Sequence, residues 1–158
     1  MKFRLRELAC AMIALSGIGA SSASAKTNWQ GEMMITAVNA ACSGGAAAVG
    51  DHALTTMLPN TVAGNGADSY IAFHINRRLA YTLKVTNGPL AAGKAYDATG
   101  ISSGANIFTF SGRISKFTMS PSALTATTRF VTVSGQITNW NNVTGCTITF
   151  DAAYVLRR

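Results

Sequence analysis

Hydrophobic and polar residues alternate along most of the chain after residue 28. In residues 29–40, Trp29, Met33 and Ile35 fall on one parity, and polar residues such as Glu32 stand between them. This period of two is typical of a half-buried β-strand. The same alternation recurs in residues 51–58, 69–75, 79–86, 106–118, 127–140 and 146–156. One apolar face and one polar face predict antiparallel pairing.

Residues 90–105 interrupt this pattern. They are small and include Gly93, Gly100 and Gly104, with no clear period of two or of 3.6. Long aperiodic segments in compact domains are often functional or mobile loops. Since the segment offers no convergent polar chemistry, we interpret it as a mobile loop.

Glycine recurs on the apolar side of three predicted strands. Residues 108–115 and 131–138 share Thr, Ser, Gly and Ile at the same offsets, which places Gly112 and Gly135 between large apolar residues. Gly31 occupies a similar position in the first strand. Glycine in a strand marks a sharp bend or the close approach of a neighbour. The pattern therefore favours curved antiparallel strands.

The N-terminus has the layout of a cleaved export signal. Basic residues at 2, 4 and 6 precede an apolar run from Leu8 to Ala20, and small residues end at Ala25 before Lys26. The apolar run is shorter than the roughly 20 residues that a membrane-spanning helix needs. We predict a signal peptide over 1–25, a single β domain over 26–158, a periplasmic or extracellular location, and no membrane-spanning segment after cleavage.

Cleavage would leave two cysteines, Cys42 and Cys146. Two cysteines in an oxidising compartment are expected to pair. Such a bond would bring the end of the first strand close to the start of the last. Together with the alternation, it predicts an all-β fold, a single-domain antiparallel β-barrel or β-sandwich of about 7–8 strands. The first and last strands would be adjacent and joined by the disulfide. The cysteine and histidine spacing does not suggest a zinc site.

The charge of the chain is basic. Loss of residues 1–25 leaves 10 basic and 5 acidic residues, a formal charge of +5. The basic residues are scattered, and adjacent pairs occur only at Arg77-Arg78 and Arg157-Arg158. A nucleic-acid surface needs basic residues clustered on one face with aromatic residues between them. We therefore expect no nucleic-acid partner and interpret the charge as an aid to solubility.

The sequence contains no recognisable catalytic set. Asp51 and His52 are adjacent, but neighbouring strand residues point to opposite faces, so they cannot readily form an orienting pair. The five remaining acids form no close pair, and phosphate-binding, dinucleotide-binding and metal-binding motifs are absent. We expect no cofactor, no metal and no catalytic residues. A small hydrolase whose site assembles only in three dimensions stays open as an alternative.

Three residues are candidate ligand contacts. Trp29 begins the first predicted strand and Arg157 ends the last, so a cation–π contact between them would form if these strands pair. This arrangement resembles the lipocalins, small ligand-binding barrels in which a late basic residue covers an early tryptophan. The resemblance implies a ligand-holding barrel. It departs from the lipocalin pattern at Thr27, where glycine is expected, and in the lack of a C-terminal helix. Trp140, in a polar turn, either covers a barrel end or contacts a sugar or a protein.

These observations favour a non-catalytic binding protein whose ligand is a small apolar molecule in a barrel mouth, a sugar or a protein. A pilus-like adhesive subunit is an alternative that requires an open strand edge. An outer-membrane barrel is another, with apolar residues facing outward. An interior void would favour the small-molecule version, and a filled interior would remove it. The residues that test this are Met33, Ile35, Phe108, Phe110, Val133 and Ile148.

Overall fold

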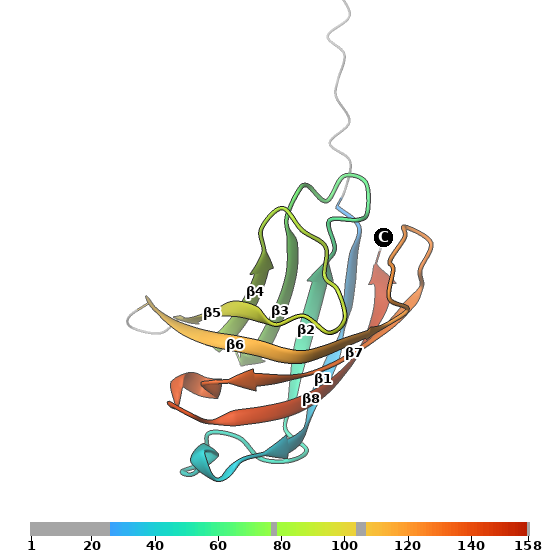
Figure 1. Cartoon of the computed structure of the whole chain (residues 1–158). Coiled ribbons are helices and arrows are strands. Elements are labelled where there is room, and N and C mark those ends of the chain that lie inside the picture. Colours follow the sequence, from blue (N-terminus) through green and yellow to red (C-terminus); the bar gives the residue numbers. More distant parts are fainter. Residues whose placement is uncertain (1–25, 77–78, 104–106, 158) are drawn as a thin grey trace, which may run out of the picture.

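The computed structural model describes residues 26–76, 79–103 and 107–157. The predicted export signal lies outside these residues. The eight strands are β1 (Asn28–Val38), β2 (His52–Leu58), β3 (Ser69–Asn76), β4 (Leu79–Val85), β5 (Tyr96–Ser103), β6 (Ile107–Ser120), β7 (Phe130–Thr138) and β8 (Thr147–Arg157). Each strand pairs with the next in antiparallel fashion, and β8 returns to β1 to close a barrel (Figure 1). The all-β prediction is confirmed, with a barrel rather than a sandwich.

The interpretation of residues 90–105 as a mobile loop is wrong for half of its length. β5 occupies Tyr96–Ser103 and pairs with β4 on one side and with β6 on the other. Gly100, for example, stands opposite both Tyr81 and Phe110. Hydrogen bonds along both backbone edges hold a strand whose small residues show no hydrophobic period. Residues 104–106 lie outside the described residues.

The first and last strands are adjacent, as predicted. β1 and β8 pair from Asn28 opposite Arg157 to Val38 opposite Ile148. Just beyond this ladder, Cys42 and Cys146 form a disulfide that closes a separation of 104 residues, with a Cα–Cα distance of 4.4 Å. The disulfide therefore joins the loop that follows β1 to the loop that precedes β8.

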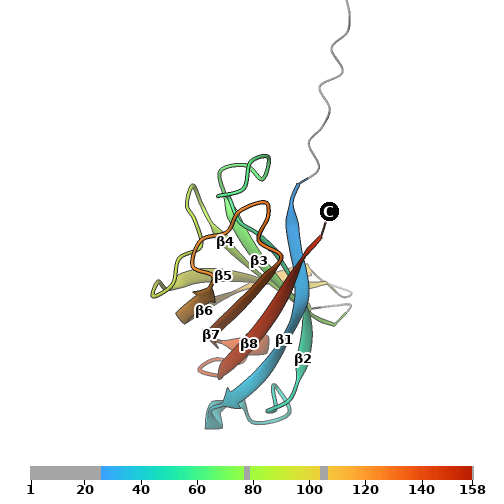
Figure 2. The same cartoon turned by 90° about the vertical axis from the view of Figure 1, so that its right-hand side faces the viewer.

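The two ends of the barrel differ. The start of β1 and the end of β8 lie at one end, which we call the terminal end (Figure 2). The loops 39–51 and 139–146 lie at the other, which we call the disulfide end. These loops contain the short 3-10 turns η1 (Ala40–Cys42) and η2 (Trp140–Asn142). Within the described residues, no helix is long and apolar enough to cross a membrane.

The described interior is filled by side chains. Thr55 and Tyr154 share a hydrogen bond of 2.9 Å inside the barrel, and the rings of Phe73 and Phe150 meet edge to face at 5.1 Å. Tyr154, Phe73 and Phe150 expose none of their surface. A side chain that a water-sized probe cannot reach from any direction does not line a cavity of that size. Side chains with 0 % exposure include Trp29, Met57, Ile71, Leu83, Phe117, Val131, Ile137 and Ile148.

The described side chains therefore show a filled interior rather than a void. Met33, Ile35, Val133 and Ile148 expose at most 2 % of their surface. The side chains of Phe108 and Phe110 lie outside the described residues. The filled centre removes a ligand enclosed deep within this part of the barrel. Apolar side chains point inward, the reverse of the arrangement expected for an outer-membrane barrel.

Two strand glycines allow close approach between neighbours. A Cβ atom at Gly31 would overlap the backbone carbonyl of Ala153 on β8. At Gly135 it would lie 3.1 Å from the ring of Phe150. The prediction that glycine admits close neighbours on the apolar side of the strands holds at these positions.

Candidate functional site

Two of the three predicted contact residues lie on opposite sides of the barrel wall. Trp29 is fully buried and donates its indole N–H to the carbonyl of Thr128 at 2.8 Å. Arg157 is exposed and pairs in register with Asn28, the neighbour of Trp29. Because side chains alternate along a strand, Arg157 points outward where Trp29 points inward. The predicted cation–π contact is therefore wrong, and Trp29 plugs the terminal end.

Trp140 covers the disulfide end. It exposes 2 % of its surface and stacks on Tyr81 with a centroid distance of 4.6 Å and an interplanar angle of 3°. The backbone N–H of Asn142 donates to the Tyr81 hydroxyl at 3.2 Å. Burial raises the pKa of Tyr81, so its hydroxyl remains protonated at physiological pH. This burial leaves the Trp140 ring poorly placed to stack on a sugar in solvent.

The large apolar side chains that remain exposed gather on one part of the barrel. Among the described side chains they are Met34, Val38, Val49, Leu54, Phe130 and Val155. They belong to β1, β2, β7, β8 or the loop between β1 and β2, and these four strands are consecutive around the barrel. We call the outer surface of these strands the β8 face. Leu54 exposes 68 % and Phe130 54 % of their surface.

A groove of about 530 Å³ runs across the β8 face. Its outward-pointing residues are Glu32, Met34, His52, Thr132, Ser134, Asp151 and Ala153. Ala153 lies in the middle, opposite Glu32 on β1 and Thr132 on β7, and its short side chain leaves a depression. Met33, Val133 and Ala152 also border the groove but point inward and expose at most 5 %. The groove is therefore a shallow feature of the outer wall.

Glu32 and Asp151 give the groove its negative charge. The Nδ1 atom of His52 lies 3.2 Å from Oε1 of Glu32, and both side chains are more than half exposed. A contact this exposed adds little to stability. Asp151 forms no ion pair with any residue that the structure describes. A carboxylate and an apolar depression thus stand side by side in solvent.

The groove does not hold a catalytic triad. Ser134, Asp151, Met34 and His52 lie in one row across four adjacent strands. Three strand spacings of about 4.8 Å separate Ser134 from His52 by roughly 14 Å. A nucleophile and its base must lie within hydrogen-bond reach. Ser134 is therefore too far from His52 to act with the His52–Glu32 contact in acyl transfer.

Charge is segregated along the chain in a way that sequence reasoning missed. No Lys or Arg occurs between Lys26 and Arg77, or between Arg129 and Arg157. These stretches form β1, β2, β3, β7 and nearly all of β8. They carry four acids, Glu32, Asp51, Asp68 and Asp151. Seven of the basic residues fall in 77–129 with one acid, Asp97. A search for adjacent basic residues could not find this, whereas counting charge per predicted strand could have.

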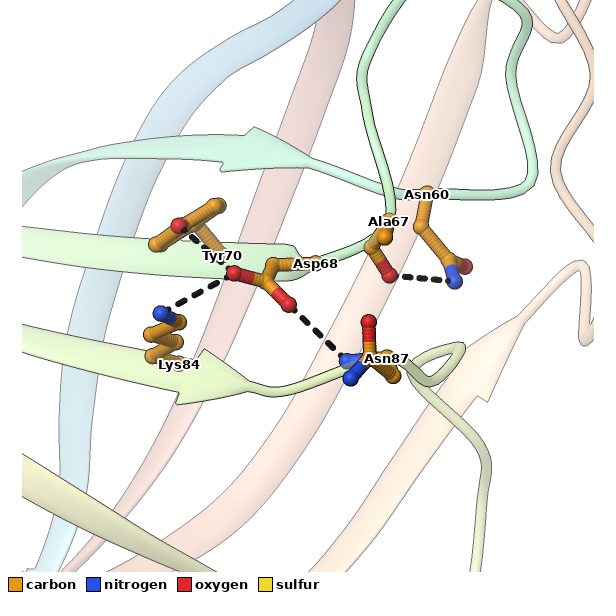
Figure 3. A network of polar contacts seen from close by, with 6 residues as sticks. All are labelled: Asn60, Ala67, Asp68, Tyr70, Lys84 and Asn87. Carbon is orange, nitrogen blue, oxygen red and sulfur yellow. Dashed lines mark hydrogen bonds and ion pairs between the residues drawn. The ribbon is translucent and has the colours of Figure 1, made fainter.

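Two ion pairs lie on or beside β3 to β6. Lys84 lies 2.9 Å from Asp68, and Arg113 lies 2.9 Å from Asp97. Asp68 also accepts the backbone N–H of Asn87 at 2.8 Å and the hydroxyl of Tyr70 at 3.2 Å (Figure 3). The Asn87 N–H, followed by Lys84, lowers the pKa of Asp68. This network ties β3 to β4 and the turn that follows.

A second pocket of about 240 Å³ lies at the disulfide end, and a third of about 260 Å³ lies among the loops of the terminal end. No group of three or more His, Cys, Asp or Glu side chains that could hold a metal ion occurs in the described part of the chain. No family model, curated protein or solved structure matches the chain.

Proposed function

We propose that this chain is an exported, non-catalytic binding domain. Its β8 face docks a polypeptide segment that combines apolar side chains with at least one Arg or Lys. The observation that carries this proposal is the gathering of exposed apolar side chains around an acidic groove. Exposed apolar patches bordered by polar residues mark interaction surfaces in soluble proteins.

The chemistry of the groove favours a basic anchor. An arginine could lay its aliphatic stem over the depression at Ala153, beside Met34, and direct its guanidinium toward Glu32 or Asp151. No Lys or Arg lines the groove to compete for these carboxylates. Arginine and aromatic residues dominate binding energy at protein interfaces because they fill such depressions.

The fold argues against the other versions of binding. Every strand has two paired neighbours, so the barrel offers no open edge for a strand from another subunit. The described interior is filled, which disfavours a ligand held in its centre. An outer-face interaction with a protein fits both facts.

Replacement of Ala153 by Arg tests the docking surface. The larger, positively charged side chain should fill the depression and repel a basic partner, with at least tenfold weaker binding. Ser111→Arg adds the same group to the exposed outer side of β6 and is the matched control. Partners captured in the native compartment by immobilised wild-type protein should be lost with Ala153→Arg and retained with Ser111→Arg.

Two results would contradict the proposal. One is equal capture by all three proteins. The other is self-association as the sole interaction, which light scattering over a range of concentrations would reveal. Export is tested separately, by the N-terminus of the protein recovered from the cell, which should lie near Lys26.

A further inference from the structure

Two Asn-Gly dipeptides lie in loops at the terminal end of the barrel. Asn65-Gly66 belongs to the loop between β2 and β3, and Asn87-Gly88 belongs to the loop between β4 and β5. An asparagine before glycine is prone to lose its side-chain amide without an enzyme, because glycine has no Cβ atom to hinder attack of its backbone nitrogen on the asparagine Cγ. The fold gives these two equivalent dipeptides different surroundings.

The amide of Asn65 is part of the interior. Asn65 exposes 4 % of its surface, and its Nδ2 atom donates to the carbonyls of Thr27 and Pro59 at 2.7 and 2.9 Å. Its backbone N–H donates to the carbonyl of Val62 at 3.1 Å. Loss of the amide would require both side-chain hydrogen bonds to break and water to reach a buried group. Folding therefore protects Asn65.

The amide of Asn87 stands in solvent. Asn87 is exposed, and its side chain forms no hydrogen bond with any residue that the structure describes. Its φ of 49° is the left-handed conformation that asparagine adopts in turns. An exposed side chain changes rotamer freely, so its Cγ atom stays open to water and to the following backbone nitrogen.

We propose that Asn87 is a site of spontaneous deamidation in the folded protein and that Asn65 is not. The backbone nitrogen of Gly88 gives its proton to hydroxide and bonds to Cγ of Asn87. The Cγ–Nδ2 bond breaks, and the leaving nitrogen takes a proton from water and departs as ammonia. Water then opens the resulting succinimide ring at Cγ to give aspartate, or at the backbone carbonyl carbon to give isoaspartate. The net reaction consumes one water and releases one ammonia.

The two products differ in their effect on the fold, because β3 and the residue before it hold this dipeptide at two points. The N–H of Asn87 donates to Oδ1 of Asp68 at 2.8 Å (Figure 3), and the carbonyl of Gly88 accepts the hydroxyl of Ser69 at 2.8 Å. Isoaspartate adds one carbon atom to the main chain between these two points, whereas aspartate keeps its length. The isoaspartate form should therefore lose at least one of the two hydrogen bonds. This site does not depend on the proposed docking function.

Incubation of the folded protein in mildly alkaline buffer, followed by tryptic digestion and mass spectrometry, tests the proposal. The peptide 85–94, which contains Asn87, should accumulate both products at a rate at least tenfold above that at Asn65. Protein unfolded in guanidinium chloride is the control, and there both sites should convert at similar rates. Equal conversion at both sites in the folded protein, no conversion at Asn87, or the same difference after unfolding would overturn the proposal.

Gly88→Ala isolates the role of the dipeptide, because the added methyl group hinders the attack and leaves the Asn87 amide exposed. The new Cβ would lie 3.2 Å from Cγ1 of Val85, the end of a side chain rather than backbone. Residue 87 of this variant should convert at least tenfold more slowly than in the wild-type protein. An unchanged rate, with the variant folded by its NMR spectrum, would refute the site.

Asn87→Asp carries the shorter product from the start and separates the effect of charge from that of chain length. Isoaspartate-containing protein, purified from the incubated sample by ion exchange, should unfold at a lower urea concentration than Asn87→Asp. Equal unfolding midpoints would contradict the loss of a contact with Asp68 or Ser69.

Discussion

The two halves of the barrel wall share one inner design and differ on the outside. β7, β8, β1 and β2 expose large apolar side chains around a groove that carries Glu32 and Asp151. The outer side of β4 and β6 carries three basic residues, Lys84, Arg113 and Lys116, and the first two form ion pairs with Asp68 and Asp97. The strands must point apolar residues inward to form the core. The identity of the inward-facing residues is therefore explained by the fold.

The outer rows are free of that requirement. An exposed Phe130 or Leu54 contributes little to folding, since more than half of each residue's surface stays in water. The ion pairs of β3 to β6 are screened by solvent and mainly keep that surface polar. The β8 face is thus the half whose composition needs an explanation outside folding.

The largest expected effect concerns the disulfide, which links the loops at the ends of β1 and β8. Cys42→Ser in oxidised protein should lower the free energy of unfolding by roughly 4–5 kcal/mol, because the long closed loop no longer restrains the unfolded chain. Thermal or urea unfolding measures this. Cys146→Ser and the double variant should give the same value as Cys42→Ser. An unchanged stability would mean that the bond does not restrain the protein in solution.

The same variants sharpen the comparison between the two halves. Hydrogen exchange should speed up most at the amides of β1 and β8, beside the freed loops, and least in β3 and β4. Uniform acceleration over all strands would show that the barrel opens as one unit.

A smaller loss is expected at the seam between β1 and β8. Gly31→Ala should cost about 1–3 kcal/mol, because the added Cβ meets the backbone of Ala153, which cannot move without shifting β8. Gln30→Ala, on the exposed side of the same strand, should change stability by less than about 0.5 kcal/mol. Urea unfolding compares the two. Equal effects would mean that the seam relaxes around the methyl group.

The fold was largely predictable from the sequence because alternation in strands reports which face is buried. The disulfide was predictable because the predicted removal of residues 1–25 leaves two cysteines, which allow one intramolecular pairing. β5 was missed because its residues are small, and its place depends on backbone pairing with β4 and β6 rather than on its own pattern.

The candidate site was much less predictable. The sequence indicated a contact between Trp29 and Arg157. In the β1–β8 register Trp29 falls on an inward position and Arg157 on an outward one, so the two lie on opposite sides of the barrel wall. The groove depends on Glu32 of β1 and on Asp151 and Ala153 of β8, and the two strands are distant in sequence and meet through the β1–β8 register. A short residue such as Ala153 gives no sequence signal of its own, since its role is to leave space between larger neighbours.

A more modest effect is expected for Tyr154→Phe, which removes an interior hydrogen bond under the β8 face. The hydroxyl of Tyr154 shares a bond of 2.9 Å with Thr55, which keeps a second partner in the carbonyl of Ala72. The loss should be about 1 kcal/mol. Tyr70→Phe, on the outer side of β3, is the matched control and should cost less. A larger loss for Tyr70→Phe would reverse the roles that we give to core and surface.

The smallest effect tests the paired charges of β3 to β6 through pH. Hydrogen bonding and Lys84 lower the pKa of Asp68 in the folded protein, so its contribution to stability is present above the ordinary aspartate pKa and is lost as the pH falls through the folded value. Asp68→Asn should therefore flatten the decline in stability below about pH 4, near the ordinary value for aspartate. Unfolding midpoints measured from pH 2 to 6 follow this.

Lys84→Met provides the complementary variant, since it removes the cation and leaves the N–H donor of Asn87. Its acid profile should lie between those of wild type and Asp68→Asn, because the Asn87 N–H still lowers the Asp68 pKa when Lys84 is absent. Added salt should weaken only the part of the Asp68 pKa shift that depends on Lys84. A Lys84→Met profile equal to that of Asp68→Asn would mean that the ion pair, rather than the turn beside β4, holds this carboxylate. The outer charges of this half would then depend on one another more than on the backbone.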